Sequence, residues 1–364
     1  MQKRRKTRQV TVGDVRIGGD APISVQSMTT MPAGQIEETL EQIAELAEAG
    51  CDLVRVAAAT VKDTRALRTI VAQSPLPIIA DVHFHYRRGL EAIEAGCHKL
   101  RINPGNLTDR KQLESLIAAA RSADVPIRIG LNAGSVRGVG AKQRARSRKA
   151  KPNLLTALTD KLARYVRFFE KRGFESLVLS AKAHDVPTTI AAYRAVSERF
   201  DYPLHLGLTH AGPPKAGTLK SAIALGALLA EGIGDTIRVS LTGDPVEEVR
   251  LGRNILAELH LGPRQEPEII SCPTCGRCQI DLARLVEQVE QRLSSLRSDL
   301  KIAVMGCMVN GPGEAEDADV GLAAGKGKAM LFRHGKKIRL VPEKDMLDAL
   351  MEEVKRAGDY KNER

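Results

Sequence analysis

The sequence has few aromatic residues. They make up 3% of the 364 positions and tryptophan is absent, whereas hydrophobic residues reach 43% and charged residues 27%, which is ordinary for a soluble globular protein. The core must therefore be built from aliphatic side chains. The most basic stretches also lack aromatic residues on which nucleic-acid bases could stack, and this counts against a nucleic-acid reader.

Long apolar runs are missing as well. The longest, around "AIALGALLAEGI", is interrupted by Glu231, and no apolar segment follows the basic start "MQKRRKTRQV". We therefore predict a cytoplasmic protein without a membrane span. In a reducing compartment, clustered cysteines bind metal or perform redox chemistry more often than they form disulfides. Cys51 and Cys97 each follow "AG" after a helical segment and are expected to be small buried side chains.

Basic residues outnumber acidic ones. The chain has 55 Lys and Arg against 44 Asp and Glu, and its net charge of +11 favours acidic partners. Two runs concentrate this charge, one from Lys3 to Arg8 and the other from Lys142 to Lys151. We predict solvated loops for both runs, with docking of an acidic protein as the alternative.

One pattern recurs from residue 22 to about residue 260: a short β-branched run, a polar or glycine-containing turn, and an amphipathic helical stretch. The eight runs are "PISVQSM", "DLVRVAA", "PIIADVHF", "KLRINPG", "PIRIGLNAG", "SLVLSAKA", "LHLGLTHAG" and "TIRVSL". Strands that alternate with helices form a parallel sheet, and eight such units match a (β/α)8 barrel. We predict an α/β fold with a TIM-type, substrate-binding barrel over residues 1–262; a doubly wound open sheet is the alternative.

In such barrels the carboxyl ends of the strands carry the chemistry. The residues at these ends are Gln26, Ser27, Arg55, Asp81, His83, Arg101, Asn103, Arg128, Asn132, Ser180, Lys182, Thr209, His210, Arg238 and Ser240. Several cations on one rim with one evident carboxylate, Asp81, would be costly without an anion, and the planar fork of arginine suits phosphate oxygens. The sequence therefore predicts a multiply anionic ligand. His83 could ligate a metal together with His85, but we favour a polar contact with substrate.

The repeating pattern ends near Glu266, where a small α+β module begins. Its expected elements are a strand "EIIS", a helix from Ile280 to about Leu296, strands around "KIAVMGC", "DVGLAA", "KAMLFR" and "KKIRLV", and a helix from Glu343 to about Arg356. We predict that this second domain spans residues 263–364.

Four cysteines of this module have the spacing of metal ligands. Cys272, Cys275 and Cys278 form C-x-x-C-x-x-C, and Cys307 follows at the end of a later strand. Spacing alone predicts either tetrahedral zinc, which would make the module structural, or an iron–sulfur cluster, which would carry electrons. Glu314, in "CMVNGPGE", is a further candidate ligand, because a carboxylate on iron exchanges more readily than a thiolate. Taken by itself, a glutamate in such a loop is expected to be exposed to solvent.

In order and spacing, several segments resemble the bacterial 4-hydroxy-3-methylbut-2-enyl diphosphate synthases of the methylerythritol phosphate pathway. They are "VQSMTT", "ADVHF", "LRINPGN", "IRIGLNAGS", "SAKAHDV", "LHLGLT", "KSAIALGALLAEGIGDTIRVSLTGDPVEE", "SCPTCGR" and "MGCMVNGPGEA". The resemblance implies a barrel followed by a [4Fe–4S] domain of the sulfite and nitrite reductase kind. It also implies an iron–sulfur oxidoreductase of isoprenoid biosynthesis that opens and reductively dehydroxylates 2-C-methyl-D-erythritol 2,4-cyclodiphosphate.

The resemblance implies roles for single residues as well. The cluster would be held by Cys272, Cys275, Cys307 and Glu314, with Cys278 outside the set and Glu314 as the ligand displaced by the substrate hydroxyl. Substrate would be bound by Arg55, Arg101, Asn103, Arg128, Asn132, Lys182, Thr209 and Ser240. Glu314, His210, Asp81 and His83 would assist catalysis. His210 stands where the family commonly has a glutamate, so acid–base duty could pass to an imidazole.

For partners, the resemblance implies single electrons from reduced flavodoxin or ferredoxin, and a head-to-tail homodimer in which each cluster domain caps the partner's barrel. No nucleic acid or membrane partner is expected. Two alternatives remain. One is a zinc-containing nucleic-acid-binding protein, suggested by the net charge of +11. The other is a non-redox barrel enzyme of the pterin-binding type with a structural cluster.

Overall fold

The computed structural model describes residues 2–362, with gaps at 104, 108, 134–153, 295, 309–312, 314 and 315. The basic run from Lys142 to Lys151 and the candidate ligand Glu314 therefore lie outside the described residues. The chain forms two units, Met1–Gly262 and Pro263–Arg364, which are described one at a time. Within the described residues, no helix is long and apolar enough to cross a membrane.

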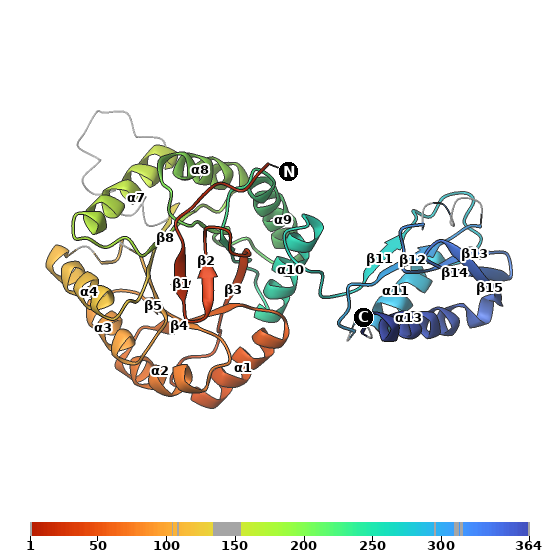
Figure 1. The fold of residues 1–364 in the computed structure, drawn as a ribbon, viewed down its shortest axis with the longest axis horizontal. Helices are drawn as coiled ribbons and strands as arrows, with labels where there is room; N and C mark the ends of the chain where they lie inside the picture. The colour runs from red at the N-terminus through yellow and green to blue at the C-terminus, as the bar shows by residue number, and fades with distance from the viewer. Residues whose placement is uncertain are drawn as a thin grey trace. The chain divides into compact units, whose positions relative to one another are not determined.

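The N-terminal unit is a parallel eight-stranded barrel inside a ring of helices (Figure 1). Its strands are β3 (Ser24–Met28), β4 (Leu53–Ala58), β5 (Ile78–Val82), β6 (Lys99–Ile102), β7 (Ile127–Asn132), β8 (Leu177–Lys182), β9 (His205–Leu206) and β10 (Thr236–Ile237). They follow the order β8-β7-β6-β5-β4-β3-β10-β9, and a parallel bridge between Leu179 and Leu204 joins the two end strands. The predicted barrel is confirmed, and the open doubly wound sheet is excluded.

The described helices of this unit each follow a barrel strand in the chain. They are α1 (Ile36–Glu48), α2 (Val61–Gln73), α3 (Tyr86–Glu94), α4 (Arg110–Ser122), α7 (Leu154–Glu170), α8 (Val186–Arg199), α9 (Pro214–Ala230) and α10 (Pro245–Glu258). Side chains at four N-caps, Thr60, Asp109, Asp185 and Asp244, accept hydrogen bonds from the first-turn N–H groups of α2, α4, α8 and α10. These caps fix where several of the loops after the strands end.

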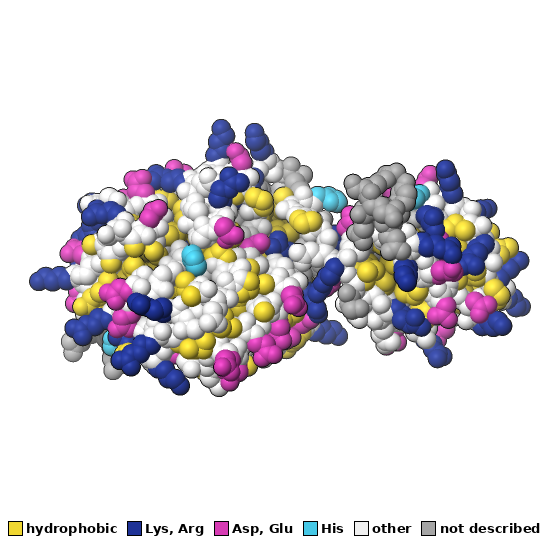
Figure 2. Space-filling view, turned by 60° about the horizontal axis from the view of Figure 1, so that its bottom comes forward, with side chains coloured by type: hydrophobic (Ala, Val, Ile, Leu, Met, Phe, Trp, Pro, Cys, Tyr) yellow, Lys and Arg dark blue, Asp and Glu magenta, His cyan; other side chains and the backbone are white. Residues whose placement is uncertain are grey.

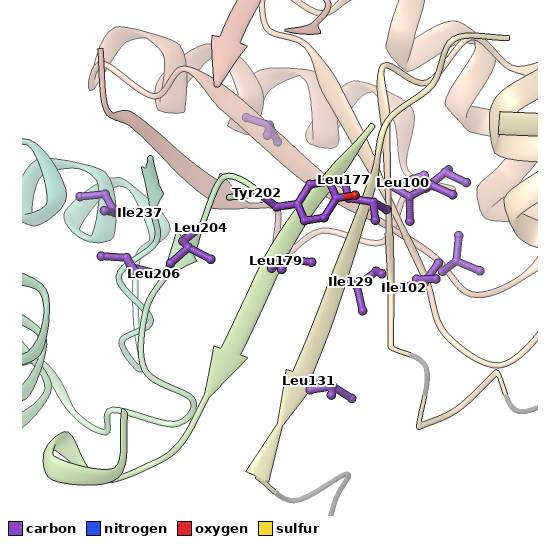
Figure 3. Packing of buried hydrophobic residues seen from close by; sticks show 14 of the residues in the cluster. Leu100, Ile102, Ile129, Leu131, Leu177, Leu179, Tyr202, Leu204, Leu206 and Ile237 are labelled. Carbon is purple, nitrogen blue, oxygen red and sulfur yellow. The ribbon is translucent and has the colours of Figure 1, made fainter. Parts of the chain in front are cut away.

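Alternation along the strands separates an apolar exterior from a polar interior. Leu100 and Ile102 of β6, and Leu177 and Leu179 of β8, belong to the core between the strands and the helices (Figure 3). Arg101 and Ser180, each next to one of these residues in the strand, point the other way and line the polar interior. Cys51 and Cys97 are buried in the same apolar core, as predicted, and burial raises the pKa of each thiol to about 12.

A hairpin that the sequence analysis did not anticipate closes the amino ends of the barrel strands. Strands β1 (Val10–Val12) and β2 (Val15–Ile17) pair antiparallel and lie across the middle of the helix ring in Figure 1. Val10, Val12 and Ile17 form a buried cluster with residues of β4, β5 and β8. This apolar plug seals one end of the barrel, so the polar interior opens at the other end.

The prediction of a solvated loop for the run from Lys3 to Arg8 is wrong for its arginines. Arg4 forms an ion pair with the buried Asp235 at 2.7 Å, and Arg5 donates to the carbonyl oxygens of Ser197, Phe200 and Tyr202. Arg8 pairs with Asp201 and Glu175 and lies over the Tyr202 ring. These contacts attach the N-terminal segment to the barrel and leave the three arginines half-buried. Lys3 and Lys6 are exposed.

The C-terminal unit is a five-stranded mixed sheet with helices packed on one face (Figure 1). Its elements are β11 (Glu268–Ser271), α11 (Leu282–Leu293), β12 (Lys301–Met305), β13 (Val320–Gly325), β14 (Lys328–Arg333), β15 (Lys336–Pro342), a 3-10 turn (Glu343–Asp345) and α13 (Met346–Asn362). Strands β11, β12 and β13 are parallel, and β13, β14 and β15 are antiparallel. The last helix begins after the 3-10 turn rather than at Glu343. Figure 2 shows charged side chains spread over both units on the face that it presents.

Candidate active site

A cavity of about 370 Å³ opens at the carboxyl ends of the barrel strands. The barrel strands, the loops after them and the first turn of α10 supply its walls: Arg55, Arg101, Arg128, Gly130, Asn132, Ser180, Lys182, Leu208, Thr209, His210, Gly212, Arg238, Ser240, Leu241, Thr242 and Glu248. The structure thus brings together all five predicted cations of the rim. Of the other predicted substrate contacts, Asn132, Thr209, His210 and Ser240 line the same cavity.

The cations of the cavity are deeply buried. Arg128 is 1% exposed and Lys182 is 7% exposed. Burial lowers the pKa of Arg55 to about 9, and burial together with neighbouring arginines holds the pKa values of Arg128 and Lys182 well below their ordinary range. Each lowered pKa means that the charged form of the side chain is unfavourable at its buried position. An anion placed among these groups would relieve that cost.

Asp81 is the carboxylate that holds two of these arginines in place. It pairs directly across the sheet with Arg101, whose Nη1 lies 2.9 Å from its Oδ1, and its Oδ2 lies 3.5 Å from Arg55 Nε and 3.6 Å from His83 Nε2. Burial tends to raise the pKa of Asp81, but Arg55 and Arg101 lower it to about 2. A carboxylate so strongly held in its ionised form orients its neighbours. It does not line the cavity itself.

A second carboxylate, Glu248, was missed by the sequence analysis. It comes from the first turn of α10, accepts the N–H of Leu241 at 2.8 Å, and lies 3.4 Å from Arg238. Burial raises the pKa of this side chain. Inspection of strand ends alone could not find Glu248, because this residue belongs to a helix and not to a strand.

His205 was also missed, because it lies at the start of β9 rather than at its end. The side chain is fully buried, with Nε2 3.3 Å from Lys182 Nζ and Nδ1 3.5 Å from Thr236 Oγ1. The Tyr193 hydroxyl donates to the carbonyl oxygen of His205 at 2.6 Å. Burial and the nearby Arg128 and Lys182 lower the pKa of His205, so the imidazole is held neutral beside the ammonium group.

Two glycines leave room for these long side chains. Gly207 follows β9 with φ +154°, and a Cβ there would lie 2.5 Å from the carbonyl oxygen of Arg238 and 2.6 Å from Lys182 Nζ. A Cβ at Gly130 would lie 3.3 Å from Arg101 Nε. Lys182 and Arg101 can reach the barrel axis because the facing positions carry no side chain.

Lys99 adds a cation below the cavity. It points to the barrel interior two residues before Arg101, is fully buried, and its pKa is lowered by burial and by Arg128 and Arg55. In the described part of the chain, Lys99 Nζ and both side-chain polar atoms of Gln26 have no hydrogen-bond partner. The polar interior therefore continues below the cavity floor.

Three predicted site residues lie outside the cavity wall. Asp81 and His83 are behind the arginines, as described above. Asn103 accepts the N–H of Gly105 through Oδ1 at 3.0 Å and shapes the loop after β6. His210 does line the cavity, and its φ of 57° lies in a region that residues other than glycine seldom adopt. A backbone held in this way is common at functional sites.

In the C-terminal unit, the paired strands β11 and β12 bring two cysteines to one edge of the sheet. Cys272 follows β11 and Cys307 follows β12, and these strands run parallel with Ser271 opposite Val304. The N–H of Gly306 donates to the Cys272 sulfur at 3.3 Å. Cys275 is exposed in the loop after β11, and hydrogen bonds from Arg277 lower its pKa. Cysteine sulfurs that accept N–H donors suit an iron–sulfur cluster.

Cys278 is placed differently. Its thiol donates to the carbonyl oxygen of Ile280 at 3.3 Å, and the side chain packs against the core beneath α11. Glu314 lies outside the described residues, and among those that are described no three His, Cys, Asp or Glu side chains gather closely enough to hold a metal ion. The thiols of Cys272, Cys275 and Cys307 are nevertheless the donor set expected for a cluster.

An eight-stranded barrel with a cation-lined cavity, followed by a sheet unit bearing cysteines at its strand ends, defines a two-domain enzyme of the TIM-barrel type. Family models described as the GcpE TIM-barrel domain and the GcpE protein C-terminal domain match residues 7–253 and 268–356. The chain belongs to this GcpE family of 4-hydroxy-3-methylbut-2-en-1-yl diphosphate synthases, as the resemblance of its motifs had indicated.

Curated relatives agree with this assignment. The chain is 51% identical to the 4-hydroxy-3-methylbut-2-en-1-yl diphosphate synthase (flavodoxin) of Geobacter sulfurreducens, over 96% of this chain and 98% of the relative. It is 50% identical to the protein of the same name from Cutibacterium acnes, over 98% of this chain and 92% of the relative. Because these identities extend over nearly the full length of the chain, both of its units resemble the relatives.

Among solved structures, the barrel is similar to Yersinia pestis dihydropteroate synthase. The TM-score is 0.51 at 14% sequence identity, and the match covers 69% of this chain and 98% of the other. At this identity the likeness concerns the fold alone. It therefore gives no support to the alternative of a pterin-type enzyme.

Proposed function

We propose that this chain converts 2-C-methyl-D-erythritol 2,4-cyclodiphosphate into (E)-4-hydroxy-3-methylbut-2-enyl diphosphate in isoprenoid biosynthesis. The reaction takes up two electrons and one proton, breaks the ring bond between carbon and phosphate oxygen, and releases one hydroxyl as water. The observation that carries the proposal is the convergence of Arg55, Arg101, Arg128, Lys182 and Arg238 on one cavity of a chain in this family.

The buried cations would bind the cyclic diphosphate and assist its opening. Ring opening turns a bridging phosphate into a terminal one, so the negative charge on the diphosphate grows as the reaction proceeds. Cations fixed in place beforehand stabilise the growing charge more than they stabilise the starting ring. Arg55, Arg101, Arg128 and Lys182 would therefore lower the barrier as well as bind substrate.

Neutral donors would orient the rest of the substrate. The cavity is lined by Asn132, Thr209 and Ser240, which can hydrogen-bond the hydroxyl and phosphate oxygens of the substrate. Asn103 would act from behind, by shaping the loop after β6. Asp81 would be a positioning residue, because it holds Arg55 and Arg101, and His83 would act through Asp81; neither side chain lines the cavity.

His210 is proposed as the hydrogen-bonding or acid–base residue at the rim. It lines the cavity, and its imidazole can donate or accept a proton at the position where the family commonly has a glutamate. The variant His210→Glu should therefore shift the pH–rate profile. An unchanged profile would show that this position does not exchange protons with the substrate.

The electrons would enter through the C-terminal unit. A [4Fe–4S] cluster held by Cys272, Cys275, Cys307 and Glu314 would supply them one at a time. Reduced flavodoxin is the proposed donor, since the relatives carry that donor in their name, and ferredoxin is the alternative. Glu314→Ala should leave a brown protein with lost or altered turnover; a colourless protein without metal would assign Glu314 a structural role instead.

We further propose a cytoplasmic, head-to-tail homodimer in which the cluster unit of one subunit serves the barrel of the other. The variants Arg128→Met and Cys272→Ser should each be inactive. After subunit exchange, half of the dimers would be mixed and each would hold one intact site, so about a quarter of wild-type activity should return. If mixing restores no activity although mass spectrometry shows exchanged dimers, each cluster serves its own barrel.

The central experiment is anaerobic turnover of the cyclodiphosphate, combined with iron and sulfide analysis of the purified protein. We expect about four irons and four sulfides per chain and formation of the linear diphosphate. Arg128→Met should retain the iron and lose turnover, whereas Arg199→Met, which removes an exposed arginine of a surface ion pair, should keep both. Zinc without iron, or activity without any reductant, would contradict the proposal.

A further inference from the structure

A group of exposed side chains lies beside the cysteine loops of the C-terminal unit. It consists of Arg277, Met308, Lys326 and Lys328, and is called the turn surface below. Arg277 belongs to the loop that carries Cys275, and Met308 follows Cys307 directly. Lys326 and Lys328 belong to the tight turn between β13 and β14.

Contacts in the structure join this turn to the cysteine loops. The N–H of Lys326 donates to Gln279 Oε1 at 2.7 Å, and Gln279 follows Cys278 in the chain. A Cβ at Gly325 would lie 2.7 Å from the Met308 sulfur, so the turn also packs against Met308. The lysines of the turn are therefore held beside the segments that bear the cysteines.

The turn surface is cationic around an apolar centre. Arg277, Lys326 and Lys328 are exposed, and Met308, which packs against the turn, is 36% exposed. Glu343, whose N–H donates to the carbonyl oxygen of Gly327, places a carboxylate residue by the same turn. Positive charge that surrounds a flexible apolar side chain is typical of surfaces on which transient partners dock.

We propose that the turn surface is where the electron donor docks, and that it fits an acidic one-electron carrier protein. The inference rests on the proposed function, because it takes the cysteines beside the turn to hold the redox centre. Docking there would bring the carrier close to the cysteine loops. Opposite charges would speed the encounter, and a small interface would let the spent carrier leave quickly.

The test uses the double variant Lys326→Glu/Lys328→Glu of the cluster-loaded protein. Its matched control is Lys336→Glu/Lys337→Glu, which changes the net charge equally at the start of β15, beyond the opposite end of β14 and about 17 Å away along that strand. Binding of oxidised flavodoxin is measured by calorimetry at low and high ionic strength. Turnover is measured with reduced flavodoxin and, separately, with dithionite.

The turn variant should bind flavodoxin at least ten-fold more weakly at low salt, and the difference should shrink at high salt because the charges are then screened. Its iron content and its turnover with dithionite should match those of the control. Equal flavodoxin binding by the turn variant, the control and the wild type would overturn the docking proposal. Equal weakening in both variants would do so too, since net charge alone would then explain the loss. A wild type that turns over with neither reduced flavodoxin nor dithionite would instead challenge the proposed function.

Discussion

Asp81→Asn is the change that most directly tests how the cationic cavity is held together. The wild-type carboxylate is 2% exposed and lies between Arg101 at 2.9 Å and Arg55 at 3.5 Å. Asparagine has nearly the same shape but no charge. The substitution therefore removes the anion between two buried guanidinium groups and leaves the packing of the barrel almost unchanged.

The expected cost can be worked out from the pKa of this group. Its pKa falls from an ordinary 3.8 to about 2. At about 1.4 kcal/mol for each pH unit by which a pKa moves, the ionised carboxylate contributes about 2 kcal/mol of folding stability at neutral pH. Leaving buried charges without their partner costs about 3–5 kcal/mol in other proteins. We therefore expect Asp81→Asn to lower the free energy of unfolding by about 2–4 kcal/mol.

The pH dependence has a definite sign. A carboxylate whose pKa is lowered on folding stabilises the protein above its unfolded pKa of about 4, and this contribution is lost as the pH falls through about 2. The stability difference between wild type and variant should therefore be full at pH 6 and shrink below pH 4. Urea unfolding at a series of pH values measures this difference directly.

A diphosphate ligand should partly repair the variant. Inorganic pyrophosphate supplies negative charge to the same arginines, so it should raise the melting temperature of Asp81→Asn more than that of the wild type. Asp160→Asn serves as the control, because Asp160 pairs with Arg199 on the surface and its loss should cost less than about 1 kcal/mol. The reasoning would be refuted if Asp81→Asn were no less stable than this control, or if pyrophosphate stabilised it no more than the wild type.

Four further substitutions should have distinct outcomes. Gly207→Ala would press a methyl group against Lys182 Nζ at a strained backbone position, so we expect a loss of about 2–3 kcal/mol in urea unfolding together with reduced turnover. Cys278→Ser should keep its iron and sulfide, whereas Cys272→Ser should lose them on metal analysis. Arg4→Ala leaves its buried carboxylate partner without that cation and should cost about 2–4 kcal/mol, which thermal unfolding can show, while substrate affinity stays unchanged.

The barrel could be predicted from the sequence because its signals are local. Each strand is a short β-branched run followed by a helix with one apolar face, and the count of such units leaves few alternatives. The hairpin of β1 and β2 gave no such signal, since each strand has three residues. Arg4 and Arg5 were misjudged for a related reason: their partners, Asp235 and the carbonyl oxygens near Tyr202, are about 200 positions away in the sequence.

The rule that the carboxyl ends of the strands carry the chemistry predicted part of the candidate site. Residues to which this rule does not apply could not be predicted from the sequence. Lys182 was predicted because it ends β8 at the rim, whereas Arg55 and Arg128 lie within β4 and β7, not at the strand ends where the sequence analysis placed them, and still line the cavity. Glu248 comes from a helix and His205 from the start of a strand, so no pattern of strand ends includes them. The lowered pKa of Lys182 likewise depends on burial and on Arg128, which only the folded chain brings beside it.

The electrostatics of the barrel interior argue for an anionic ligand independently of any relative. Among the described residues, six cations (Arg55, Lys99, Arg101, Arg128, Lys182 and Arg238) share the interior with two carboxylates, Asp81 and Glu248. Stability alone would favour apolar side chains there, because burying unpaired charge is costly. The apolar shell of Leu and Ile outside the strands and the plug beneath them offset that cost and keep the cations in place. A diphosphate that enters the cavity therefore meets cations that are already positioned and poorly solvated, so its binding should stabilise the whole barrel in proportion to the logarithm of its concentration.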